Sequence, residues 1–145
     1  DKNDILSIPF TTGEKVPVKF DIRVHLRSGN VNTNSTYFSG GYAFKLNGEI
    51  LTFTPDFESI SDFTRNIGGA YWGSMDSEEL IAYQSMHLLE IEALKPWAAI
   101  DYVEITVYSD PNPPVDELPL VSAGENKSLT LPNNRLISRW LYSKF

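Results

Sequence analysis

The stretch from Val16 to Leu26 constrains the fold of this chain more than any other segment. Its apolar residues fall at every second position: Val16, Val18, Phe20, Ile22, Val24 and Leu26. An alternation with period two predicts a strand with one buried face and one face in water. A slip of one residue would bury Lys19, Asp21 and Arg23, so the inward face is fixed. Pro17 has no N–H for a ladder, which predicts an edge or a strand start there.

Further segments predict the other strands of an antiparallel protein. Tyr42 to Thr54 predicts a hairpin around Asn47-Gly48, because both turn positions tolerate a positive φ. In that register Phe44 faces Leu51. The alternation from Tyr102 to Tyr108 predicts a second firm strand. Two closing strands are predicted near the end, at Leu129 to Leu131 and Leu136 to Tyr142.

Two segments favour short helices. Phe57 to Ile67 carries an apolar stripe at helical spacing, and Asp56 before it is a natural N-cap. From Asp76 to Lys95 the spacing fits either a helix or a strand. We expect a helix up to about Gln84. From Met86 to Leu94 we expect a strand that forms a hairpin with the strand after it.

These elements predict one domain over residues 1–145 with a mainly β fold, an antiparallel β-sandwich with one or two short helices. A length of 145 residues with 41% hydrophobic content is enough for a single globular core. The pattern of alternating strands and helices that a parallel α/β sheet requires is not found. The predicted shared core consists of Phe20, Ile22, Val24, Val103, Ile105 and Val107.

No catalytic, metal or cofactor motif stands out, so we predict that the protein is not an enzyme, with no catalytic residues, metal ligands or cofactor. The chain has no cysteine, which removes thiolate nucleophiles and Cys-based zinc sites. Its two histidines, His25 and His87, form no metal-binding spacing. We expect His25 to be solvated on the wet face of its strand. Ser74 lacks the G-x-S-x-G elbow of a hydrolase nucleophile.

Charge is segregated along the chain. The stretch from Leu46 to Asn126 holds 15 acidic residues and two basic ones, and the whole chain has a net charge of −7. An acidic domain repels phosphate backbones and anionic lipid, and it steers basic partners toward itself. We therefore expect no nucleic-acid partner, and instead a protein partner with a basic surface patch.

Two segments are predicted to form the binding surface. Gly68 to Met75 holds two large aromatics between glycines, so Tyr71 and Trp72 would anchor a partner, together with nearby Asp76. The proline-rich loop from Asp110 to Pro119 is stiffened before it binds. Its predicted contacts are Asp110, Asn112, Asp116 and Glu117. Two simpler readings stay open, in which Trp72 covers the core and the proline-rich loop is a solvated crossover.

A small, acidic, cysteine-free β-domain that begins at Asp1 without a methionine resembles the periplasmic lipoproteins that act as immunity proteins against type VI secretion toxins. The resemblance covers the layout of Val16 to Leu26, Phe57 to Gly69 and Tyr102 to Tyr108, and it includes no diagnostic motif. It implies an inhibitor in the periplasm or cell envelope that plugs a toxin's active site or blocks its interfacial surface, often a lipase's. A lipid anchor absent from this chain would be its membrane contact.

Two other functions stay open. A carbohydrate-binding module would stack Trp72, Tyr71 and Trp97 on sugar rings, and a structural component of a surface appendage would pair through an edge strand. Neighbouring genes would separate the three functions. A toxin gene would support the inhibitor, polysaccharide enzymes the sugar binder, and pilus or secretion genes the appendage.

Overall fold

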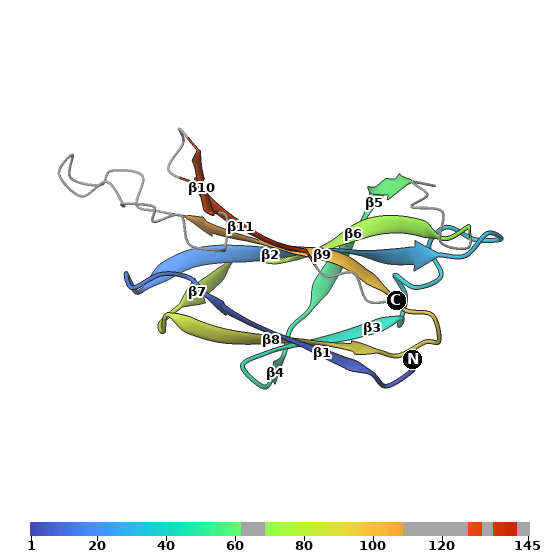
Figure 1. Ribbon diagram of the computed structural model, residues 1–145, viewed down its shortest axis with the longest axis horizontal. Helices are drawn as coiled ribbons and strands as arrows, with labels where there is room; N and C mark the ends of the chain where they lie inside the picture. The colour runs from blue at the N-terminus through green and yellow to red at the C-terminus, as the bar shows by residue number, and fades with distance from the viewer. Residues whose placement is uncertain (62–68, 109–127, 132–134, 142–145) are drawn as a thin grey trace.

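A computed structural model describes residues 1–61, 69–108, 128–131 and 135–141 of this chain. Within these residues all regular structure is β, and there is no helix. Two antiparallel sheets pack face to face around one hydrophobic core (Figure 1). The predicted antiparallel β-sandwich is therefore confirmed, whereas its one or two short helices are not found in the described part.

The smaller sheet has four strands in the order β1-β8-β3-β4. They are β1 (Ile5–Thr11), β3 (Tyr42–Leu46), β4 (Glu49–Ile50) and β8 (Met86–Ala93). The backbone N–H of Thr12, just after β1, donates to the carbonyl of Ser85 at 2.9 Å. Hydrogen-bonded positions alternate in an antiparallel pair, so the even-numbered residues of β1 are the ones whose backbone bonds to β8. Pro9 is at an odd position, where an N–H would face outward. It removes one donor from this edge strand and so discourages pairing with other chains.

The larger sheet has seven strands, in the order β10-β11-β9-β2-β6-β5 with β7 also paired to β2. They are β2 (Val18–Gly29), β5 (Phe53–Ser61), β6 (Tyr71–Ser77), β7 (Leu80–Ala82), β9 (Ile100–Tyr108), β10 (Ser128–Leu131) and β11 (Arg135–Leu141). The two predicted closing strands are confirmed as β10 and β11, within one residue at their ends. The turn predicted between them, at residues 132–134, lies outside the described residues.

The centre of the core is where the sequence predicts it. β2 and β9 pair antiparallel, which places Phe20 opposite Val107 and Ile22 opposite Ile105. All six residues of the predicted core are at most 5% exposed. β2 begins at Val18, directly after Pro17, so the strand start predicted at this proline is confirmed. Val16 is not part of the strand and is 44% exposed.

The helix predicted over Phe57 to Ile67 is wrong where the structure describes it, because the chain continues as β5 to Ser61. The rest of that segment lies outside the described residues. The register of β5 on β6 shifts between Asp56 and Ser61. Asp56 is opposite Ser74 and Ser61 is opposite Trp72, so the four residues 57–60 of β5 lie opposite one residue of β6. A bulge of this kind breaks the period of two and yields the spacing of three between Phe57 and Ile60, which imitates a helix.

The second predicted helix, up to about Gln84, is also wrong. The chain instead forms the end of β6 and then β7, which pairs with the first residues of β2. Leu80 and Ala82 turn toward the core, and Ile81 between them is 52% exposed. Pairing with an exposed β2 edge satisfies the backbone of this short segment better than one isolated helical turn would.

The hairpin predicted over Tyr42 to Thr54 is confirmed next to its turn at Asn47-Gly48, with φ values of 53° and 86° and Leu46 opposite Glu49. Its second arm is shorter than predicted, because β4 ends at Ile50 and Phe53 and Thr54 belong to the other sheet. The chain then crosses to the other sheet, so that Phe53 of β5 stacks on Phe44 of β3 across the core, with ring centroids 4.1 Å apart. The strand predicted from Met86 to Leu94 is confirmed as β8. Its predicted hairpin with the next strand is wrong, because β8 and β9 belong to different sheets.

A histidine lies between the two sheets. His87 is 6% exposed and stacks on Phe10, with centroids 5.0 Å apart. Its Nε2 is 3.2 Å from Thr12 Oγ1, and its Nδ1 is 3.1 Å from Asn47 Nδ2. Because Asn47 Oδ1 accepts the N–H of Leu88, the amide nitrogen of Asn47 faces and donates to Nδ1. The neutral ring therefore carries its hydrogen on Nε2, and burial lowers the pKa of His87 below its ordinary value.

We expect acid to weaken the fold through His87. The unfolded chain takes up this proton near about pH 6.5, but the folded chain binds it only at lower pH. The contribution of a neutral His87 to the free energy of unfolding is therefore complete above the pKa of the unfolded chain. It declines as the pH falls toward the lowered pKa of the folded chain. The free energy of unfolding of the wild type, relative to His87→Gln, should shrink between about pH 7 and about pH 5 in urea titrations. A pH-independent difference would contradict this expectation.

Candidate functional site

The outer face of the seven-stranded sheet carries the richest group of polar and aromatic side chains in the described residues. Because Phe20, Ile22 and Val24 face the core, the residues between them on β2 face outward. Their neighbours on β5, β6 and β9 follow from the strand registers. We call this group the outer polar face: Arg23, His25, Asp56, Trp72, Ser74, Asp76, Tyr102 and Glu104.

Three rings stack across three neighbouring strands. His25 of β2 lies with its centroid 4.9 Å from Tyr102 of β9 and 6.4 Å from Trp72 of β6. The rings are within 16° and 24° of parallel. The 4.9 Å between the His25 and Tyr102 rings matches the distance between paired strands. The rings therefore stand upright on the sheet, with their edges outward. His25 Nδ1 also lies 3.1 Å from Ser74 Oγ, so His25 is half-buried and partnered rather than simply solvated as expected.

An arginine with two carboxylates lies beside the rings. Arg23 Nε is 2.9 Å from Asp76 Oδ1, and Arg23 Nη2 donates to Asp56 Oδ2. Burial alone would lower the pKa of Arg23, but Asp76 and Asp56 together raise it. Burial raises the pKa of Asp76, opposed by the Arg23 charge. Both aspartates are thus held in place by one cation.

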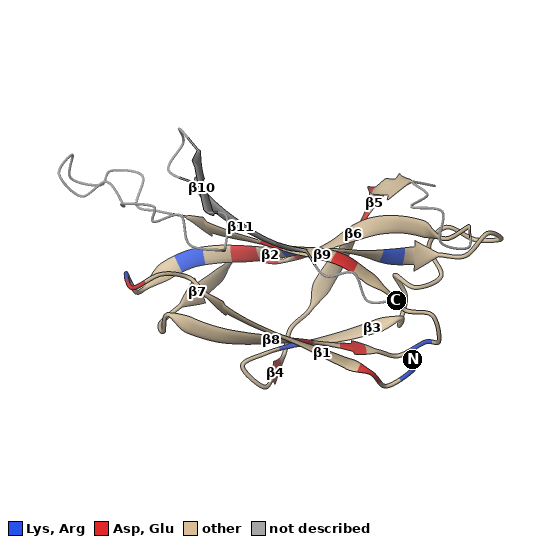
Figure 2. Ribbon diagram, viewed as in Figure 1, with Lys and Arg blue, Asp and Glu red and all other residues tan. Residues whose placement is uncertain are grey.

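The outer face of this sheet carries charges of both signs. Its outward positions on β2 include Lys19, Asp21, Arg23 and Arg27, and Figure 2 shows basic and acidic positions along β2 and acidic colour on the neighbouring β9. Glu104 of β9 is opposite Arg23, and Tyr108 donates a hydrogen bond to Asp21. Asp56 and Asp76 contact Arg23, so part of their negative charge is neutralised.

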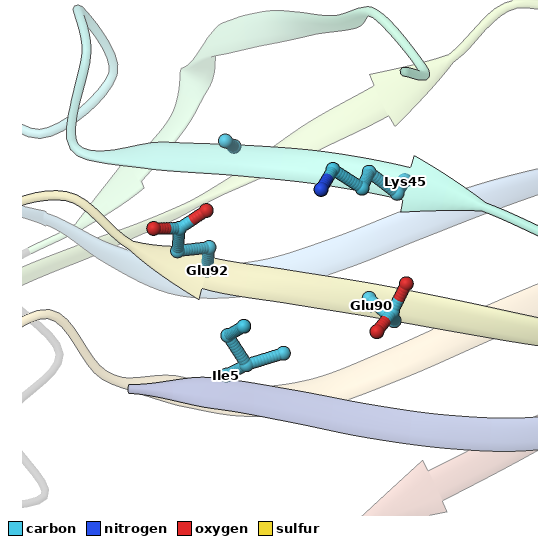
Figure 3. A pocket seen from close by; sticks show the side chains of 5 residues that line it. Ile5, Lys45, Glu90 and Glu92 are labelled. Atoms are coloured by element: carbon cyan, nitrogen blue, oxygen red, sulfur yellow. The ribbon is translucent and has the colours of Figure 1, made fainter. Parts of the chain in front are cut away.

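A shallow hollow of about 20 Å³ on the other sheet is lined by Ile5, Ala43, Lys45, Glu90 and Glu92 (Figure 3). It holds about one water molecule. Among the described residues, no three His, Asp or Glu side chains are grouped as metal ligands. No helix in that part of the chain is long and apolar enough to cross a membrane.

The structure places Tyr71, Trp72 and Asp76 on the strand β6 rather than on a loop. Trp72 and Asp76 belong to the outer polar face, next to Arg27 and Arg23 of β2, respectively. Tyr71 is out of phase with them, on the side of the strand that Met75 buries in the core. Trp72 is half-buried, so it is not fully enclosed as a lid on the core. That these residues bind a partner stays a prediction.

The other half of the predicted surface cannot be placed. Asp110, Asn112, Asp116 and Glu117 lie outside the described residues.

Sequence reasoning missed most of the outer polar face. The alternation of β2 already turns Arg23 and His25 toward solvent, which was the available signal. Their partners were hidden, since Asp56 reads as a helix cap and Tyr102 as an ordinary strand residue. Only the pairing of β2 with β6 and β9 brings these groups together.

The fold and this face together define an antiparallel β-sandwich whose outer sheet surface carries stacked aromatic rings and charges of both signs. The sequence matches no protein family, no characterised protein and no solved structure.

Proposed function

We propose that this protein is a non-enzymatic binding protein of the cell envelope, an immunity-type inhibitor that occludes a secreted antibacterial toxin. It would act in the periplasm, held by a lipid anchor outside this chain. The outer polar face would be its contact surface. The observation that carries the proposal is the stack of Trp72, His25 and Tyr102 beside fixed carboxylates.

The stack supports protein binding because its rings are already ordered. Trp and Tyr are the residues most enriched at binding hot spots, where large rigid side chains lose little entropy. His25 lies between the two rings and bonds to Ser74, so none of the three needs to be ordered by the partner. The upright rings present edges, and an indole N–H such as that of Trp72 can add a directional bond to an apolar contact.

The same geometry disfavours this face as a sugar platform. A sugar ring stacks on the flat face of an aromatic side chain, but here His25 covers one face each of Trp72 and Tyr102. A strand edge for appendage assembly is disfavoured on β1, where Pro9 removes a donor.

The carboxylates support a basic partner. Asp56 and Asp76 contact Arg23, Glu104 is opposite it on β9, and the whole chain carries a net charge of −7. Complementary charge raises association rates more than it slows dissociation. A toxin whose catalytic cleft is rimmed by Lys and Arg is the partner that this surface fits.

The direct test is protection of a susceptible bacterium. The products of the neighbouring genes are produced one at a time in the periplasm, with and without this protein sent to the same compartment, and a product that stops growth is taken as the toxin. We expect growth to be restored, and the purified pair to associate more slowly as salt rises from about 0.05 M to about 0.5 M.

The matched control sends another small acidic β-domain to the periplasm at the same level. No protection, or an association rate that salt leaves unchanged, would refute the proposed mechanism. Hydrolytic turnover by this protein alone would refute its non-enzymatic character.

A further inference from the structure

A second tryptophan lies exposed at the end of the sandwich where β8 finishes. Trp97 is 78% exposed, the most exposed tryptophan side chain among the described residues. Its φ is 67°, in the left-handed region that residues with a side chain rarely adopt. Local backbone strain of this kind persists only where surrounding contacts hold it, and it is concentrated at functional sites.

The loop around Trp97 is held by four contacts to its carbonyl groups and to a facing loop. Arg27 Nη1 donates to the carbonyl of Trp97 at 3.1 Å, and the Tyr37 hydroxyl donates to that of Pro96 at 2.6 Å. Lys95 Nζ reaches across to the carbonyls of Thr36 and Ser39, at 2.6 and 2.9 Å. The backbone is therefore fixed while the indole stays in solvent.

The loop that faces this segment is polar and uncharged. From Ser28 to Gly41 it contains no acidic or basic residue. Its Asn32, Thr33 and Asn34 are exposed. The two cations that contact these loops are engaged, because Lys95 binds carbonyls and Arg27 binds Asn30 Oδ1 at 2.8 Å in addition to the Trp97 carbonyl.

We propose that this end of the sandwich is a binding site for neutral carbohydrate, with Trp97 as its stacking platform. The indole is 78% exposed and can stack on the apolar C–H face of a sugar ring, whereas His25 already occupies one face of Trp72 on the outer polar face. Amide and hydroxyl groups of the facing loop would bind the sugar hydroxyls. The site is independent of the proposed inhibitor function.

Neutral sugar fits these observations better than a protein anchor would. A hot-spot tryptophan is normally ringed by contacts that exclude water. The facing loop offers amides and hydroxyls, which match a ligand rich in hydroxyl groups. A residue with a large side chain stands at φ 67°, a conformation that glycine would adopt without strain.

The test follows the indole N–H signals by NMR while cellohexaose, chitohexaose or maltohexaose is added. We expect the Trp97 signal to move with at least one of these oligosaccharides. Because Trp97→Gly lacks this signal, its affinity is measured by calorimetric titration beside the wild type. Trp97→Gly should weaken that binding about tenfold or more, without lowering the thermal midpoint, since glycine accepts the left-handed backbone. The matched control is Tyr83→Ala, because Tyr83 is 75% exposed but precedes β8, at the opposite end of that strand.

The proposal is overturned if none of the three sugars moves the Trp97 signal. It is also overturned if Trp97→Gly binds like the wild type, or if Tyr83→Ala loses as much affinity as Trp97→Gly. A loss of toxin protection in Trp97→Gly without sugar binding would assign Trp97 to a protein interface instead. Protection that is unchanged in this variant keeps the two sites separate.

Discussion

Replacing Ile22 by alanine is expected to lower the free energy of unfolding by about 2–5 kcal/mol. Ile22 is 0% exposed and lies opposite Ile105, which is 1% exposed, in the middle of the β2–β9 pair. Truncation removes apolar contacts and leaves a cavity that two paired strands cannot close. Urea titration followed by circular dichroism measures the change, with the slope against denaturant expected to stay constant.

The matched control for Ile22 is Ile81, an isoleucine of the same sheet that is 52% exposed. Ile81→Ala should change the free energy of unfolding by no more than about 0.5 kcal/mol. Equal effects of the two substitutions would mean that β2 does not form the centre of the core.

Replacing Trp72 by alanine is expected to weaken binding to the toxin by about 2 kcal/mol or more. The indole is the largest side chain of the outer polar face, and its removal also leaves His25 without one of its two stacked neighbours. Most of the loss should appear as faster release, because steering by the carboxylates remains. Surface-immobilised toxin with the variant in solution separates the two rates.

Two controls accompany Trp72→Ala. Tyr83→Ala removes an aromatic side chain that is 75% exposed and is not a member of the outer polar face, so its affinity should equal that of the wild type. The thermal midpoint of Trp72→Ala shows whether the half-buried indole also supports the fold. A stable Trp72→Ala protein with unchanged affinity would remove this residue from the binding surface.

Elements with a clean local period could be predicted from the sequence. The inward faces of β2 and β9, the Asn47-Gly48 turn and the strand β8 all depend on neighbouring residues in the chain. Segments that depart from the period could not. The bulge between Asp56 and Ser61 in β5 has the spacing of a helix, and only pairing with β6 shows that it is a strand.

The candidate site also has a part that the sequence could predict and a part that it could not. The sequence indicated Trp72 and Asp76 because an aromatic residue near glycines and acids is visible in one segment. It could not place Asp56 against Arg23, or His25 between Trp72 and Tyr102, because each of these contacts joins different strands. Such contacts depend on which strands pair and in what register.

By itself, the sequence determined that this chain is mainly β, which side of its best strands is buried, and that its net charge is negative. The tertiary structure decided which strands are neighbours, that β8 and β9 belong to opposite sheets, and which side chains meet on the outer face. The reason is physical: burial of one face is set by a period of two along the chain. The partner of a strand is instead chosen by packing of the whole core, with segments far apart in the sequence.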